Sequence, residues 1–180
     1  KPDYKRFGLS GMTSDIKKVF VRRIHDVAGI TNKNIKVKYD SNVIPIKTFP
    51  QYVDLYIGNK DDAARVHEVA ENERWEYVVT MSPTHEFQQV SFVNGIHTSK
   101  GGKHVDYVLN QITKKMIALI EKKKKVTVTA NSIKEQLLLF LRCDIENPAF
   151  DSQTKDYMNT PSGKFGSSCH VSDKFIEKLA

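Results

Sequence analysis

The chain has 180 residues and a formal charge of +7, because 28 lysines and arginines outnumber 21 aspartates and glutamates. This balance favours anionic partners such as nucleic acid or an anionic membrane. No apolar run approaches the roughly 20 residues that cross a bilayer, and no apolar segment follows the first residues, so we expect a soluble, non-secreted protein. Cys143 and Cys169 lack the spacing of a zinc site or a disulfide framework, which predicts free thiols.

The first predicted element is a helix. Apolar side chains recur at helical spacing over residues 14–28, and the opposite face carries basic side chains. Ser14 is the expected N-terminal cap, and Gly29 lies where the helix should stop.

A hairpin and a second helix are expected next. Residues 35–39 and 43–46 are the predicted strands, and the residues between them, 40–42, have the side chains that favour turns. A helix through Tyr52 then ends at Gly58.

The chain changes character after Gly58. Residues 59–72 are polar and carry only a weak helical pattern, so they are expected to connect two parts. The first part is predicted at residues 1–58 and the second at residues 73–180.

The second part intermixes strands and helices. Residues 75–81 and 87–93 look like an antiparallel pair of strands, residues 104–122 form the clearest amphipathic helix, and residues 137–145 are typical of a fully buried strand. The shorter elements expected are a strand-like segment at residues 126–129, a brief helix from Ile133 and a helix from Ser172. This mixture predicts an α+β fold with a sheet covered by helices on one face.

A lysine-bearing loop follows the buried strand. Pro148 prevents the strand from continuing, and Asp151, Ser152 and Thr154 are side chains that favour turns, so the loop is expected to be ordered. Lys155 would then present an ammonium suited to contacting a phosphate. The alternative is an ordinary solvated surface lysine.

The segment Lys100-Gly101-Gly102-Lys103-His104 at a helix start suggests a phosphate loop. It fails the P-loop pattern, because His97 stands at the first glycine position and His104 at the hydroxyl position. We therefore expect the glycines to form a tight turn against the sheet. His97 and His104 lack a completed ligand set, so a neutral, hydrogen-bonded role is expected for each and no metal is assigned.

A run of lysines ends the long helix. Lys122, Lys123, Lys124 and Lys125 would complement the helix dipole, and they would also attract a phosphate backbone without reading bases. The sequence alone supports both interpretations.

Two strings carry a family resemblance: ENPAFDSQTK at residues 146–155 and SFVNGIHTSKGGKHVDYV at residues 91–108. Together they resemble eukaryotic-type DNA topoisomerase II, where the ATPase domain joins the DNA-cleaving core. Other segments that resemble this family are KPDYKRFG, VRRIHDVAG, YVDLYI and FGSSC. The resemblance implies that residues 1–58 are the tail of a GHKL-type ATPase domain. Residues 73–180 would be a transducer domain of ribosomal-protein-like fold with a left-handed βαβ crossover.

The resemblance also assigns roles to the candidate residues. Gln153, Thr154 and Lys155 match the family's QTK loop, which implies that they bind ATP and that Lys155 is catalytic and senses the terminal phosphate. The lysine run at residues 122–125 resembles the family's DNA-contacting loop. ATP with Mg²⁺ would be the cofactors of the full-length enzyme, held by residues upstream of this segment.

The implied setting is a homodimeric type II topoisomerase that acts on double-stranded DNA. The segment's partners would be the upstream ATPase domain and the downstream cleavage core of the same chain. Without the ATP-binding boxes and the cleavage tyrosine, the segment alone should be inactive. The resemblance implies a nuclear location, or a cytoplasmic one if the source is a large DNA virus. The alternative function is a non-enzymatic, basic nucleic-acid-binding domain of similar fold.

Overall fold

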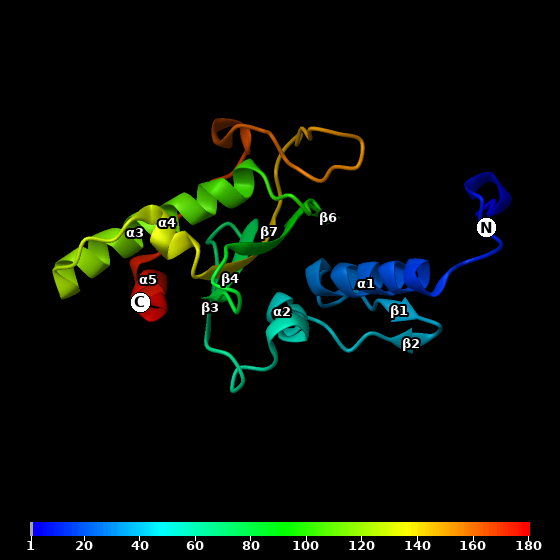
Figure 1. The fold of residues 1–180 in the computed structure, drawn as a ribbon, viewed down its shortest axis with the longest axis horizontal. Helices are drawn as coiled ribbons and strands as arrows, with labels where there is room; N and C mark the ends of the chain where they lie inside the picture. The colour runs from blue at the N-terminus through cyan, green and yellow to red at the C-terminus, as the bar shows by residue number, and fades with distance from the viewer. Residues whose placement is uncertain (1) are drawn as a thin grey trace. The chain divides into compact units, whose positions relative to one another are not determined.

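The computed structural model describes residues 2–180, and the chain divides into two compact units between Tyr52 and Val53 (Figure 1). None of the helices among the described residues combines the length and apolar character needed to cross a membrane. The division expected from the sequence, at residues 58 and 73, remains a prediction.

The first unit is built around a long helix, α1 (Ser14–Ile30), after a short 3-10 helix, η1 (Lys5–Phe7). The helix is confirmed, but its cap is Thr13 rather than Ser14, because the Thr13 side chain accepts a hydrogen bond from the amide of Ile16. The helix also continues through Gly29. A β-carbon at Gly29 would lie 2.5 Å from Cβ of Tyr52, so the glycine permits close packing and does not end the helix.

The predicted hairpin is present but shorter than expected. Strand β1 (Lys38–Tyr39) pairs antiparallel with β2 (Asn42–Val43) across a two-residue loop. Asp40 and Ser41 both have positive φ angles, 45° and 67°, as a tight hairpin loop with right-handed strand twist requires. Asn42, predicted in the turn, belongs to the second strand. Helix α2 (Phe49–Ile57) then ends before Gly58, as predicted.

The second unit contains a mixed sheet with the strand order β3-β4-β7-β5-β6. The strands are β3 (Arg65–Val69), β4 (Trp75–Met81), β5 (Gln88–Val93), β6 (Ile96–His97) and β7 (Leu137–Cys143). The predicted antiparallel pairing of β4 with β5 is wrong, because β7 lies between them, antiparallel to β4 and parallel to β5. The consecutive apolar side chains of β7 are buried on both faces of the sheet, which explains why β7 is its central strand.

Strand β3 lies within the predicted connector. The weak helical pattern there was misleading, because residues 65–69 pair with β4 as an edge strand. Polar side chains support this pairing: His67 contacts Glu76, and the Tyr77 hydroxyl donates to Glu68. The prediction of a strand-like segment at residues 126–129 is also wrong. It has no strand structure, and Thr129 at its end caps α4 (Ala130–Lys134) through a bond from the amide of Ser132.

Helices cover one face of the sheet (Figure 1). Helix α3 (Lys103–Lys124) packs its apolar stripe there, beside α5 (Asp173–Leu179), and the short 3-10 helix η2 (Ser162–Lys164) precedes α5. The rings of Tyr77 and Phe175 lie 5.1 Å apart in this core, and Cys143 and Cys169 are buried there as free thiols. The α+β fold is therefore confirmed. The chain crosses from β5 to the parallel β7 through α3 and α4, and the handedness of that crossover remains a prediction.

Candidate functional site

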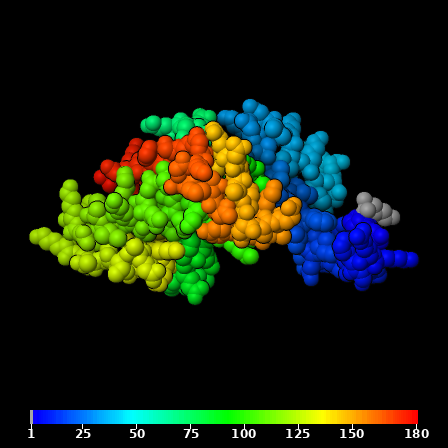
Figure 2. Space-filling model, turned by 90° about the horizontal axis from the view of Figure 1, so that it is seen from above, coloured from blue at the N-terminus to red at the C-terminus, as the bar shows by residue number. Residues whose placement is uncertain are grey.

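The loop that carries Gln153, Thr154 and Lys155 is a hydrogen-bonded hairpin. Phe150 and Met158 form an antiparallel bridge at its base, and the amide of Asp151 donates to the carbonyl of Tyr157 at 3.2 Å. Near the tip, the amide of Lys155 donates to the carbonyl of Ser152 at 3.1 Å. These backbone bonds confirm the expectation of an ordered loop, and Figure 2 shows residues near 150 at the surface.

Lys155 is exposed at the end of this turn, with a left-handed φ of 60°. Its ammonium lies 5.7 Å from the centre of the Phe150 ring, within the range of a cation–π contact. Among residues 2–180, no carboxylate forms an ion pair with it. Gln153 and Thr154 are also exposed, but the hydroxyl of Thr154 is engaged in hydrogen bonds with Ser152 and Asp156.

Asp156 fastens the loop to the turn that precedes α3. Its carboxylate accepts hydrogen bonds from Thr154 Oγ1 at 2.8 Å and from Ser99 Oγ at 3.0 Å, and its carbonyl accepts from the amide of Lys100 at 2.9 Å. The hydrogen bond from Thr154 and then that from Ser99, aided by the charge of Lys100, lower the pKa of Asp156. This contact was not predictable from the sequence, because Ser99 lies 57 residues away from Asp156 along the chain.

Met158 makes a second attachment to the same turn. Its amide donates to the carbonyl of Gly101 at 3.1 Å, and its carbonyl accepts from the amide of Lys103 at 2.8 Å. Gly102 has a φ of 144°, and a β-carbon there would lie 2.3 Å from the Met158 carbonyl oxygen. The predicted structural role of the glycines is thus confirmed, but Gly102 packs against the backbone of Met158 rather than against the sheet.

His104, at the start of α3, is fully buried. Burial lowers its pKa to about 3, so the ring is neutral, and Nε2 lies 3.2 Å from Thr98 Oγ1. The expected neutral, hydrogen-bonded role is confirmed for His104. The ring of His97 lies 5.3 Å from that of Phe92, and its protonation state remains a prediction. No group of three or more His, Cys, Asp or Glu side chains within the described residues could hold a metal ion.

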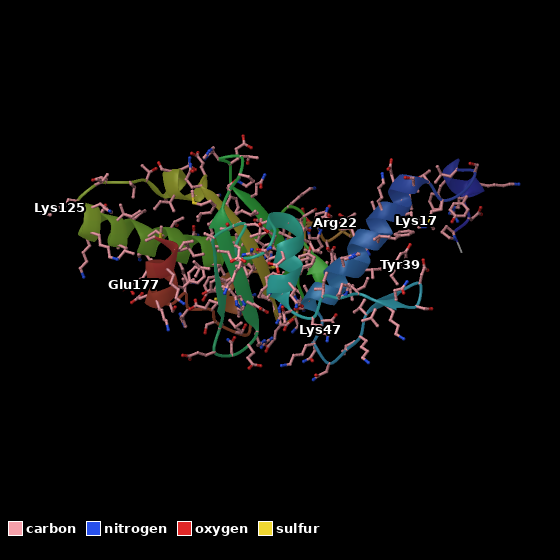
Figure 3. The ribbon with its side chains drawn as sticks, turned by 90° about the horizontal axis from the view of Figure 1, so that it is seen from below. Lys17, Arg22, Tyr39, Lys47, Lys125 and Glu177 are labelled. Carbon is pink, nitrogen blue, oxygen red and sulfur yellow. The ribbon has the colours of Figure 1, made fainter. Side chains whose placement is uncertain are left out.

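The lysine run lies at the other end of α3. Lys122, Lys123 and Lys124 form its last turn, and Lys125 ends the helix in a left-handed conformation with a φ of 55°. All four are exposed, and within the described part of the chain none forms an ion pair. Figure 3 labels Lys125 at the end of the helix. A helix of 22 residues is about 33 Å long, at 1.5 Å per residue, so the lysine run and the Lys155 loop are separate sites.

The chain matches the family model described as DNA gyrase B over residues 48–180. DNA topoisomerase 2-alpha of Mus musculus is 45% identical, and the alignment covers 98% of this chain and 12% of that protein. DNA topoisomerase 2 of Arabidopsis thaliana is 42% identical, with 99% of this chain and 12% of that protein covered. The chain therefore spans about an eighth of the length of these relatives.

Solved structures agree with the sequence matches. The ATPase region of Saccharomyces cerevisiae topoisomerase II superimposes with a TM-score of 0.88 and 38% identity, over 99% of this chain and 45% of that one. The ATPase and transducer domains of DNA topoisomerase II from Balamuthia mandrillaris give a TM-score of 0.83 and 41% identity, over 92% of this chain and 41% of that one.

Proposed function

The chain belongs to the DNA gyrase B family, of the eukaryotic topoisomerase II type, and we propose that it is the transducer segment of an ATP-dependent type II DNA topoisomerase. In this proposal, residues 73–180 are the transducer domain, residues 59–72 a connector, and residues 1–58 the tail of a GHKL-type ATPase domain. The whole enzyme would be a homodimer that passes one DNA duplex through another. Its location would be nuclear, or cytoplasmic in a large DNA virus.

The observation that carries the proposal is the ammonium of Lys155, which forms no ion pair within residues 2–180 and is carried by a hydrogen-bonded loop. A cation fixed in this way stabilises the negative charge on the equatorial oxygens of a phosphoryl group during transfer. The amide of Gln153 beside it can donate a further hydrogen bond to the same phosphate, and Thr154 completes the ATP-binding tip. Lys155 would therefore act on the terminal phosphate of an ATP molecule held by the ATPase domain.

The described residues fit ATP better than they fit its metal. Exposed donors at Gln153 and Lys155 suit a phosphate, whereas the residues described contain no cluster suited to Mg²⁺. Mg²⁺ accompanies ATP in phosphoryl transfer and neutralises charge on its phosphates. In this proposal it would be held by upstream residues of the ATPase domain.

Binding of the terminal phosphate also gives the loop a sensing role. A group that contacts ATP but not ADP has the differential affinity needed to shift a conformational equilibrium. Residues attached to the loop lead directly into α3, and the far end of α3 carries the lysine run at residues 122–125. We place the DNA backbone contact there, so that one helix connects the nucleotide contact to the DNA contact.

Steady-state ATP turnover by the full-length enzyme tests the proposal. Lys155→Ala should lower DNA-stimulated turnover and strand passage at least about tenfold, since loss of an electrostatic donor costs that much or more. Lys164→Ala removes an exposed lysine from η2 and is the matched control, with turnover unchanged. Normal turnover by Lys155→Ala would instead favour a nucleic-acid-binding domain that needs no nucleotide.

A further inference from the structure

We propose that Asp156 is a positioning residue that holds Lys155 toward the terminal phosphate and leaves its charge unpaired. The inference rests on the proposed contact between Lys155 and ATP. Asp156 itself would touch neither nucleotide nor reacting atoms. It would act through the conformation of the loop.

The hydrogen bonds around Asp156 fix the residues on both sides of Lys155. Thr154 Oγ1 donates to the Asp156 carboxylate at 2.8 Å, so the residue before Lys155 is tied to the residue after it. Ser99 Oγ donates to the other carboxylate oxygen at 3.0 Å, and the amide of Lys100 donates to the Asp156 carbonyl at 2.9 Å. The turn before α3 therefore holds the peptide segment that determines where Lys155 points.

The same arrangement keeps the nearest acid away from Lys155. A carboxylate next to Lys155 in sequence could neutralise its ammonium and compete with a phosphate. Instead, Asp156 has Lys100 as its cationic neighbour, with Nζ 3.9 Å from Oδ2, while the ammonium of Lys155 lies over the Phe150 ring. Asp156 thus fixes the loop without forming an ion pair with the lysine that it positions.

This role predicts the sign of a measurable effect. Removing a negative charge near a triphosphate should strengthen ATP binding if the residue has no other role, because like charges repel. Loss of a positioning residue should weaken it. For both Asp156→Asn and Asp156→Ala, a purely electrostatic role therefore predicts tighter ATP binding, whereas a positioning role predicts weaker ATP binding.

The test measures dissociation constants of the full-length enzyme for a non-hydrolysable ATP analogue and for ADP. Asp156→Ala should weaken analogue binding about tenfold, the scale of one charge-assisted hydrogen bond, and leave ADP binding within about twofold. Asp151→Asn is the matched control: it removes one charge from the same loop, but that carboxylate bonds only Ser152 within the loop, so binding should be unchanged or slightly tighter. Analogue binding by Asp156→Ala as tight as in the wild type would overturn the inference.

A second arm separates this inference from the proposed function. If Asp156 acts through Lys155, Asp156→Ala should cause no further loss in a Lys155→Ala background, whereas a further tenfold loss would refute the positioning role. Wild-type analogue binding by Lys155→Ala alone would refute the proposed function. If Asp156→Ala does not fold, Ser99→Ala removes a single hydroxyl from the same attachment. It should weaken analogue binding severalfold without affecting ADP, and unchanged binding would overturn the inference.

Discussion

Gly102 lies so close to Met158 that a β-carbon on Gly102 would be 2.3 Å from the carbonyl oxygen of Met158. The contact joins the turn before α3 to the base of the Lys155 loop, and Gly102 also has a φ of 144° that other residues rarely adopt.

Gly102→Ala should therefore lower the free energy of unfolding by about 2–3 kcal/mol, through backbone strain and overpacking. Urea unfolding of the protein measures this change. Gly163→Ala is the control, because a β-carbon there meets no atom within 4 Å, and its stability should stay within about 0.5 kcal/mol of the wild type. Equal stability of the two variants would show that the turn can move away from Met158 at little cost.

Glu76 is expected to make stability depend on acid pH. The carboxylate is buried between His67, whose Nε2 lies 2.8 Å away, and the guanidinium of Arg142. Burial raises the pKa of Glu76, but the hydrogen bond from His67 and the charge of Arg142 outweigh it and lower the pKa below the ordinary value of 4.5. A depressed pKa means that the stabilisation is present above the unfolded-state pKa and is lost as pH falls through the folded-state pKa.

Glu76→Gln should cost about 2 kcal/mol near neutral pH, because it leaves Arg142 without its anion. The difference from the wild type should shrink as the pH falls below the ordinary value of 4.5 and through the lowered pKa of Glu76 in the folded protein, because the wild-type carboxylate then becomes protonated. Unfolding free energies measured across this range check both effects. Glu177→Gln, an exposed substitution on α5 that Figure 3 labels, should leave the curve unchanged. A constant difference at every pH would contradict the role given to the ionised Glu76.

Neutralising the lysine run should weaken DNA binding in a salt-dependent way. Each lost phosphate contact lowers the slope of log affinity against log salt by about 0.9, so replacing Lys122, Lys123, Lys124 and Lys125 by glutamine should lower it by up to about 3.6. Titration of the full-length protein with duplex DNA over a range of salt concentrations measures the slope. The control replaces another four exposed lysines, Lys33, Lys36, Lys38 and Lys60, with the same change in net charge. If the slope of log affinity against log salt is the same in the two variants, the loss of DNA binding follows from net charge alone, and the lysine run is not a specific DNA contact.

The sequence predicted those elements whose signal is local. The apolar stripe of α3 and the continuous apolar run of β7 identify a helix and a buried strand without knowledge of their neighbours. Pairing was not predictable in the same way. Strands β4 and β5 are close in sequence, but β7 lies between them in the sheet. Strand β7 is buried on both faces and therefore takes a central place, with one strand paired along each of its edges.

Strand β3 and the attachment of the Lys155 loop were missed for a related reason. Glu68 and His67 look like residues of a polar connector until Tyr77 and Glu76 of the neighbouring strand provide their partners. Asp156 looks like one more turn residue until Ser99 is seen beside it. In each case the physical cause is a polar contact with another segment, nine residues away for His67 and Glu68 and 57 residues away for Asp156, and no local pattern specifies the partner.

The most direct test of the account is whether Lys155 distinguishes ATP from ADP. In the full-length enzyme, Lys155→Ala should weaken binding of a non-hydrolysable ATP analogue by at least about tenfold and leave ADP affinity unchanged, since only the terminal phosphate loses a charged partner. Lys164→Ala should bind both nucleotides like the wild type. Equal affinity of wild type and Lys155→Ala for the analogue would contradict the claim that this loop contacts the terminal phosphate.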